Sequence, residues 1–213
     1  MDITREQIFE TWSQFAQTLD GRSLQYFFVG GLAVRMVAAQ SCSRKLTVND
    51  LRDHSDIDII VFEEDLIDFL RLFAMSRFHV WHAAKVGLTG GYDGEHHHVS
   101  IKDQETGVVL GLFVARRIPN GRMIRTNLFD NICPDAIFEY GPIVVNSLRL
   151  NVVAPEWLYY NSIMRTGEKK RDAQLVWPYV DLVKFNTIQD QAYKVPMVRS
   201  EYVGFVEWLD GEF

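Results

Sequence analysis

Two aspartates, Asp56 and Asp58, stand one residue apart at the start of the β-branched segment 56–62. This segment predicts a strand. Side chains alternate between the faces of a strand, so both carboxylates project together while Ile57 points the other way. Neighbouring carboxylates in apolar surroundings repel each other and lose hydration. A divalent cation relieves both effects, and oxygen ligands at this spacing suit Mg²⁺, which takes one or two carboxylates plus substrate phosphates. Taken alone, the pair also fits the solvated beginning of a strand.

A pair of glycines, Gly30 and Gly31, separates the aromatic apolar run 24–29 from the helical segment 32–40. Glycines let the backbone turn sharply and approach a ligand without a Cβ in the way. A helix that begins there presents free N–H groups to an anion such as a triphosphate. The spacing is neither the dinucleotide-binding fingerprint nor a P-loop. A tight strand-to-helix turn without a ligand is the alternative that the glycines alone leave open.

The rest of the chain supplies the elements that must position these residues. Helical spacing of apolar residues occurs before and after the two segments and again near the end, at residues 5–19, 63–75, 155–165, 172–185 and 199–209. Strands are predicted at residues 79–86, 97–102, 108–115, 143–145 and 148–153, and the second and third of these form a hairpin. Strands first and helices last predict an α+β fold. We expect a core at residues 1–153 and a C-terminal helical region at 154–213 that packs on it.

Composition and charge exclude several classes of protein. The 213 residues are 47% hydrophobic and 23% charged, which fits a chain that buries a core without a disulfide scaffold. With 22 basic and 28 acidic residues, the net charge of −6 provides no positive field for duplex DNA. The two cysteines have no metal-binding spacing. No apolar run approaches the roughly 20 residues that span a bilayer, so we expect a cytoplasmic protein without a membrane partner.

Together the glycine turn and the acid pair resemble the DNA polymerase β-like nucleotidyltransferase superfamily. Its signature is an apolar strand, Gly-Gly or Gly-Ser, a helix, and then Asp-x-Asp on the next strand. The string Arg52-x-His54-x-Asp56-Ile57-Asp58 is similar to the antibiotic nucleotidyltransferases and the related nucleotidyltransferase-like toxins, in which a basic residue and a His or Thr precede the acids. The resemblance covers residues 24–115 and extends weakly to 155–158 and 169–172. It implies a mixed sheet flanked by helices.

The resemblance also implies a reaction: Mg²⁺-dependent transfer of a nucleoside monophosphate from a nucleoside triphosphate to a hydroxyl acceptor. Two ions, roughly 3.5–4 Å apart in such sites, orient the triphosphate and activate the hydroxyl that attacks the α-phosphorus as pyrophosphate leaves. The acceptor is open between a small molecule, a protein side chain and an RNA end. The family pattern assigns metal binding and catalysis to Asp56 and Asp58, and nucleotide binding to Gly30, Gly31, Arg52 and His54.

The family's third carboxylate, which lies on a later strand just after a short hairpin, is missing here. Its counterpart would fall near Gly111, in the segment 108–114 that contains no acid. Three explanations are open. Another acid (Asp93, Glu95 or Asp103) supplies the ligand, or the enzyme works with two carboxylates and water. Alternatively, the protein keeps the fold without transferase activity and serves as a nucleotide- or protein-binding module.

Three further polar clusters have both a functional and a structural interpretation. His96 and His98 share one face of a strand and could hold a metal, although a solvated loop-to-strand junction is favoured. An arginine cluster after the hairpin suits phosphate or an RNA backbone, or forms a solvated face; it consists of Arg116, Arg117, Arg122 and Arg125. The basic run 169–171 could reach substrate phosphates.

Overall fold

The computed structural model of the chain describes residues 3–52, 57–74, 76–87, 95–117, 123–126, 132–163 and 168–194. Three residues singled out above, His54, Asp56 and Asp93, lie outside these ranges, as do the predicted helix 199–209 and Arg122. For parts of some strands and helices, the backbone alone is described. Among the described helices, none combines the length and the apolar character needed to cross a membrane.

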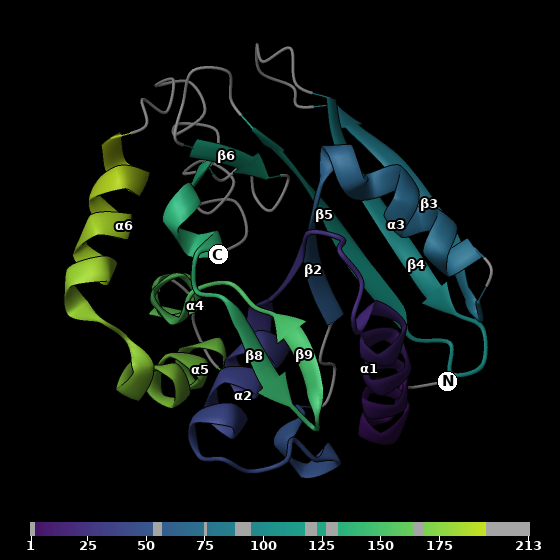
Figure 1. The fold of residues 1–213 in the computed structure, drawn as a ribbon, viewed down its shortest axis with the longest axis horizontal. Helices are drawn as coiled ribbons and strands as arrows, with labels where there is room; N and C mark the ends of the chain where they lie inside the picture. The colour runs from purple at the N-terminus through teal and green to yellow at the C-terminus, as the bar shows by residue number, and fades with distance from the viewer. Residues whose placement is uncertain are drawn as a thin grey trace, which may run out of the picture.

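A mixed sheet forms the centre of the molecule, with strands in the order β1-β2-β5-β4-β3 (Figure 1). β2 runs parallel to β5, and the other neighbours along this order are antiparallel. β6 and β7 continue from β5. The bounds are β1 Tyr26–Val29, β2 Ile57–Phe62, β3 Phe78–Gly87, β4 Glu95–Asp103, β5 Val109–Arg117, β6 Met123–Thr126 and β7 Ile132–Pro134. The predicted hairpin is therefore present as β4 and β5.

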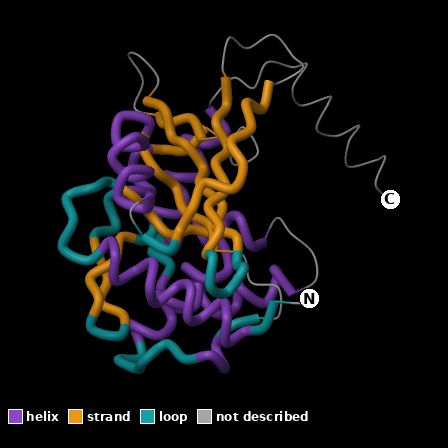
Figure 2. The backbone as a smooth tube through the Cα atoms, turned by 90° about the vertical axis from the view of Figure 1, so that its right-hand side faces the viewer, coloured by secondary structure: helices purple, strands orange, loops and turns teal. Residues whose placement is uncertain are grey.

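β8 (Pro142–Val145) and β9 (Leu148–Asn151), where two strands were predicted, pair with each other in a second sheet (Figure 2). The chain that leaves β9 returns to β1, where Val153 N–H donates to the Phe28 carbonyl over 3.1 Å. Because β1 is the first strand in the order of the main sheet, this contact covers part of its free edge.

Helices α1 (Arg5–Leu19) and α3 (Leu66–Ala74) cover one face of the sheet through aromatic packing. Phe15 of α1 stacks on Phe73 of α3, with ring centroids 4.5 Å apart, and meets Phe28 and Phe78 of the sheet edge-on. Thr4 begins α1 with a reciprocal capping box, which satisfies backbone groups at the helix start. The predicted helix 63–75 starts later than expected, because Glu63–Asp65 forms a 3₁₀ turn.

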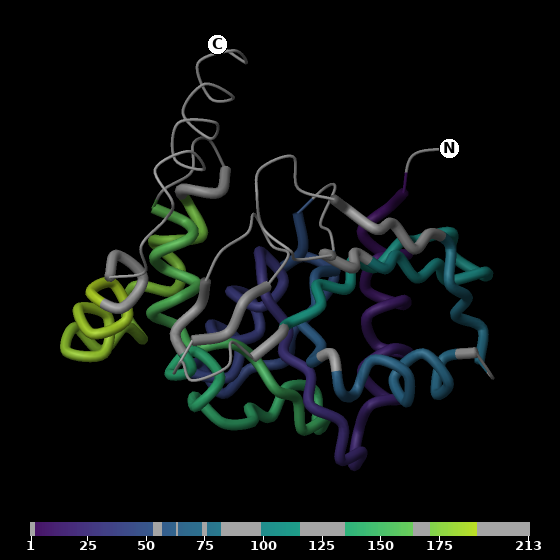
Figure 3. The backbone as a smooth tube through the Cα atoms, turned by 90° about the horizontal axis from the view of Figure 1, so that it is seen from above, coloured from purple at the N-terminus to yellow at the C-terminus, as the bar shows by residue number. Residues whose placement is uncertain are grey.

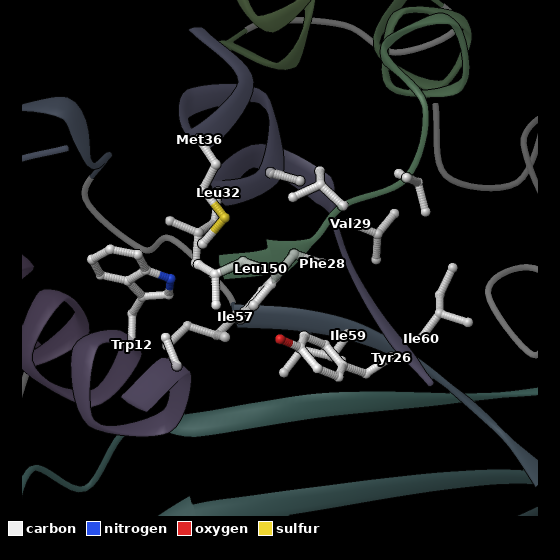
Figure 4. Packing of buried hydrophobic residues seen from close by; sticks show 14 of the residues in the cluster. Trp12, Tyr26, Phe28, Val29, Leu32, Met36, Ile57, Ile59, Ile60 and Leu150 are labelled. Carbon is white, nitrogen blue, oxygen red and sulfur yellow. The ribbon is translucent and has the colours of Figure 1, made fainter. Parts of the chain in front are cut away.

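Helix α2 (Gly30–Ser41) follows β1 without a linker and is buried along most of its length. Figure 4 shows Leu32 and Met36 of this helix beside Trp12 of α1, Ile57 of β2 and Leu150 of β9. The helix therefore joins the main sheet to the second one. It also contacts the C-terminal helices α4 and α5.

The C-terminal region consists of α4 (Pro155–Ile163), α5 (Glu168–Val176) and α6 (Leu182–Lys194), on the opposite side of the molecule from α1 (Figure 3). Two sequence expectations are wrong here. The segment expected to be a polar link, 167–172, forms the first half of α5 from Glu168 onward. The single helix expected at 172–185 is interrupted by the 3₁₀ turn Trp177–Tyr179, because Pro178 lacks an N–H and cannot continue a helix.

A buried polar network fixes α1 to the β4–β5 turn. The Asp103 carboxylate accepts hydrogen bonds from the Thr11 hydroxyl at 2.8 Å and from the Arg77 guanidinium at 2.6 Å. Burial by itself would raise the pKa of Asp103, but hydrogen bonds from Thr11 and the Glu105 N–H, with the charge of Arg77, lower that pKa below its ordinary value. A carboxyl with a lowered pKa stabilises the fold above its unfolded pKa, and this contribution is lost as the pH falls through the folded pKa.

We therefore expect Asp103→Asn to lower the free energy of unfolding at pH 7 by about 2–3 kcal/mol, the usual value of hydrogen bonds to a charged group. Urea unfolding of the natural chain and the variant between pH 7 and pH 3 measures the effect. The difference between the two proteins should shrink as the pH falls, because Asp103 then becomes protonated. A difference that stays constant down to pH 3 would contradict this role for the charge.

Candidate functional site

Asp58 is the second residue of β2 and lies between β1 and β5. Its backbone neighbours are Val29 in β1 and Gly111 in β5. Asp58 is partly exposed, whereas the other residues of β2 are buried. The strand therefore holds this carboxylate at a fixed place with one open side, which suits an oxygen ligand for a hard cation.

The glycine turn lies directly against this carboxylate. Gly30 has φ +74°, a left-handed conformation that side chains disfavour, and a Cβ there would stand 2.8 Å from Asp58 Oδ2. Both reasons require glycine at position 30. In the described part of the chain, the N-cap residue Val29 makes no side-chain cap hydrogen bond to the first turn of α2. Asp58 and the start of α2 are thus brought together, as the family resemblance implied.

At Gly31 the neighbour is a different group, the end of the Arg52 side chain. A Cβ at Gly31 would overlap the Arg52 guanidinium and stand 3.4 Å from Asp172 Oδ2, whereas its backbone is not left-handed. Arg52, which precedes β2, therefore lies over the first turn of α2. Its predicted role at the phosphates is compatible with this place and remains a prediction.

Two charged residues that the sequence did not single out complete this region. Asp172 in α5 accepts hydrogen bonds from Arg52 Nη2 at 2.7 Å and from Arg35 Nη1 at 2.9 Å. We call Arg35, Arg52 and Asp172 the arginine–aspartate cluster. The signal for Arg35 was present in the sequence, because an arginine inside an otherwise apolar helix must find a partner when it is buried.

The β5 strand stands where the family pattern predicts the third carboxylate. Gly111 is the backbone partner of Asp58 in the parallel pairing, so the two positions are on the same face of the sheet. The position beside Gly111 on the next strand is Ser100. This row therefore offers a glycine and a serine where a further acid was sought.

Of the alternative acids, the two in the described part of the chain, Glu95 and Asp103, do not take its place. Asp103 is completely buried and paired with Arg77, and it stands three positions after Ser100, an odd offset that puts it on the opposite face of β4. Glu95 begins β4, and the backbone places it roughly 17 Å along the strand from Ser100. Asp93 lies outside the described residues. Within the ranges given above, no group of three or more His, Cys, Asp or Glu side chains could hold a metal, but these ranges omit Asp56.

The remaining clusters are placed by their backbones. In β4, His96 pairs with Val86 of β3, and His98 lies between Ala84 of β3 and Phe113 of β5; the side chains of the two histidines are not described. Arg116 of β5 pairs with Arg125 of β6, again with backbone positions only. Residues 169–171 belong to α5, on the same helix as Asp172. The described contacts therefore concentrate the site at the start of α2, Asp58 and the arginine–aspartate cluster.

Solved structures of nucleotidyltransferases share this fold. The solution structure of the antibiotic-resistance factor ANT(2'')-Ia matches with a TM-score of 0.57 and 14% identity, over 99% of this chain and 100% of that chain. A crystal structure of ANT(2'')-Ia in complex with adenylyl-2''-tobramycin gives 0.53 and 13%, over 86% and 95%. The lincosamide antibiotic adenylyltransferase LnuA, lincomycin-bound, gives 0.50 and 14%, over 83% and 98%.

Comparison of the sequence with protein-family models and with curated proteins gives no match. At identities of 13–14%, the likeness to the solved structures concerns the fold. It confirms the expected α+β architecture with a mixed sheet flanked by helices.

Proposed function

The chain has the fold of the polymerase β-like nucleotidyltransferase superfamily, and from this premise we propose that it transfers a nucleoside monophosphate from a nucleoside triphosphate to a hydroxyl acceptor. One observation carries the proposal. The Asp58 carboxylate stands on the sheet directly beside the left-handed Gly30 at the start of α2. A carboxylate that could bind a metal and the backbone N–H donors of the first turn of α2 therefore lie side by side, which supports a site for a triphosphate with its metal.

The residues present fit Mg²⁺ at this place. Asp58 is a partly exposed carboxylate beside a cradle that any side chain at position 30 would fill. Asp58 and Asp56 would hold the ion, which would neutralise phosphate charge and lower the pKa of the attacking hydroxyl. The first-turn N–H groups of α2 would bind the phosphates, and Arg52 would contribute a fixed positive charge. His54 would assist the phosphates from the segment that precedes β2.

For the acceptor we propose a small hydroxylated molecule. ANT(2'')-Ia holds adenylylated tobramycin and LnuA holds lincomycin, and the net charge of −6 disfavours long nucleic acids. A protein side chain and an RNA end are the other acceptors to be tested. We place the reaction in the cytoplasm, where nucleoside triphosphates and Mg²⁺ are supplied.

The proposal is tested by incubating the full chain with Mg²⁺ and each of the four nucleoside triphosphates labelled at the α-phosphate. Hydroxylated antibiotics, total cell protein and RNA are added as separate acceptor pools. The expected result is release of pyrophosphate and label on a small molecule. Label on protein or RNA would keep the transfer reaction and change the acceptor. Absence of pyrophosphate release with every pool would contradict the transferase assignment.

Gly111 favours a second candidate function. Because a glycine stands where the third carboxylate is expected, the protein could bind the nucleotide without transferring it. Calorimetry with the same triphosphates and Mg²⁺ separates the two functions. Binding without pyrophosphate release supports the nucleotide-binding module.

A further inference from the structure

The arginine–aspartate cluster joins three distant parts of the chain at the start of α2. Arg35 belongs to α2, Arg52 precedes β2, and Asp172 belongs to α5. The side chains of Arg35 and Asp172 are 9% and 3% exposed, and that of Arg52 is 20% exposed. Each carboxylate oxygen of Asp172 receives one guanidinium: Oδ1 from Arg35 and Oδ2 from Arg52. A buried carboxylate thus bridges two arginines.

One side of this bridge, Arg35, is held by two further hydrogen bonds. Arg35 donates from Nε to the Asp50 carbonyl at 2.6 Å and from Nη1 to the Gly31 carbonyl at 2.8 Å, besides its bond to Asp172. These contacts fix the Arg35 guanidinium, which in turn fixes Oδ1 of Asp172. The orientation of the carboxylate then determines where Oδ2 can hold the Arg52 guanidinium.

The other side of the bridge is the candidate phosphate site. Arg52 is the more exposed arginine, and its guanidinium occupies the space that a side chain at Gly31 would need. Two guanidiniums and one carboxylate leave one net positive charge (2 − 1 = +1) in the cluster. This charge is held beside the first turn of α2, where free N–H groups also favour anions.

We propose that Asp172 is a positioning residue that holds Arg52 against Gly31 for the triphosphate. The inference rests on the proposed function, because it assumes that the triphosphate binds at the start of α2. Without the carboxylate, the Arg35 and Arg52 guanidiniums repel each other. Arg35 is the more buried of the two and is also bonded to two backbone carbonyls, so we expect the repulsion to shift the more exposed Arg52 guanidinium away from its place against Gly31.

If Asp172 positions Arg52, the substitution Asp172→Asn should change the affinity for the triphosphate in the opposite direction from the one expected of charge alone. Asp172→Asn removes a negative charge near the proposed phosphates, so a purely electrostatic effect would tighten triphosphate binding. Loss of the anchor for Arg52 would weaken it instead. The sign of the change therefore distinguishes positioning from the general field of the protein.

The experiment is calorimetry of the full chain with Mg²⁺ and each nucleoside triphosphate. We expect Asp172→Asn to raise the dissociation constant roughly 10-fold, the scale of one lost charge-assisted hydrogen bond. Arg52→Gln should have a similar effect, and the double variant should bind no more weakly than Arg52→Gln, because both changes remove the same interaction. Asp68→Asn is the matched control, since Asp68 forms an exposed ion pair with Arg71 elsewhere.

Equal or tighter binding by folded Asp172→Asn would overturn the inference and leave the proposed function intact. No binding of any triphosphate by the natural chain would overturn both. If Asp172→Asn does not fold, Gly31→Ala takes its place, because its Cβ displaces the Arg52 guanidinium while Asp172 and Arg35 stay paired. The same loss of affinity is expected, and unchanged affinity in folded Gly31→Ala would overturn the inference.

Discussion

Asp58→Asn should reduce transfer from the nucleoside triphosphate by on the order of 10³-fold, while the protein remains folded. The carboxylate is the proposed ligand for Mg²⁺, and the charge stabilisation that a metal supplies is several kcal/mol. Asparagine has almost the same shape and can still occupy the space beside Gly30, so the sheet should be unaffected. Initial rates of pyrophosphate release at saturating Mg²⁺ measure the effect.

Asp65→Asn serves as the control for this substitution, because Asp65 accepts a hydrogen bond from the Gln25 N–H in an exposed place at the far end of β2. Its transfer rate should be within about twofold of the natural chain. Asp56→Asn should behave like Asp58→Asn, since the two carboxylates are proposed to share the metal. Full transfer activity in Asp58→Asn would remove the carboxylate from the mechanism.

Gly111→Asp should make the stability of the protein depend strongly on Mg²⁺. Gly111 and Asp58 are backbone partners on adjacent strands about 4.8 Å apart, so a new carboxylate there would stand beside Asp58. Without metal, the two like charges repel and the melting temperature should fall. With Mg²⁺, the third oxygen ligand should reverse this loss, tighten metal binding by roughly 10-fold and raise any transfer activity.

Gly111→Asn is the matched variant, because it adds the same bulk without the charge. Thermal unfolding of both variants with and without Mg²⁺ separates the effects. A loss of stability that is equal in the two variants and unaffected by Mg²⁺ would mean that position 111 does not face the metal. Asp93, which lies outside the described residues, would then be the remaining candidate for the third carboxylate ligand.

The parts of the fold that were predictable follow from local patterns. The β-branched run after Asp56 correctly predicted β2, and the two runs around a polar turn correctly predicted the β4–β5 hairpin. Gly111 also lies beside the strand that carries Asp58, as expected. These succeeded because alternation and turn residues are properties of neighbouring positions. The closeness of Gly30 and Asp58 followed from the family pattern and is now explained by a left-handed turn.

Other parts depend on contacts that no local pattern records. Arg35 and Asp172 are 137 positions apart, so no local pattern indicates their pairing, and α5 begins at Glu168, where a polar link was expected. Periodicity alone also failed at Pro178. The helical spacing of apolar residues predicted one continuous helix, but Pro178 has no N–H to donate and the helix is interrupted there. A buried arginine signals that a partner exists but does not identify that partner.

The arginine–aspartate cluster also has a consequence for biosynthesis. A ribosome completes β1, α2 and β2 when it has made 62 residues, but Asp172 is added only after most of the remaining chain has been synthesised. Because synthesis proceeds at roughly 5–20 residues per second, a nascent chain carries Arg35 and Arg52 for several seconds without their shared carboxylate. Protein fragments released early during translation would therefore contain the acid strand and the glycine turn, yet lack the residue that fixes both arginines beside them.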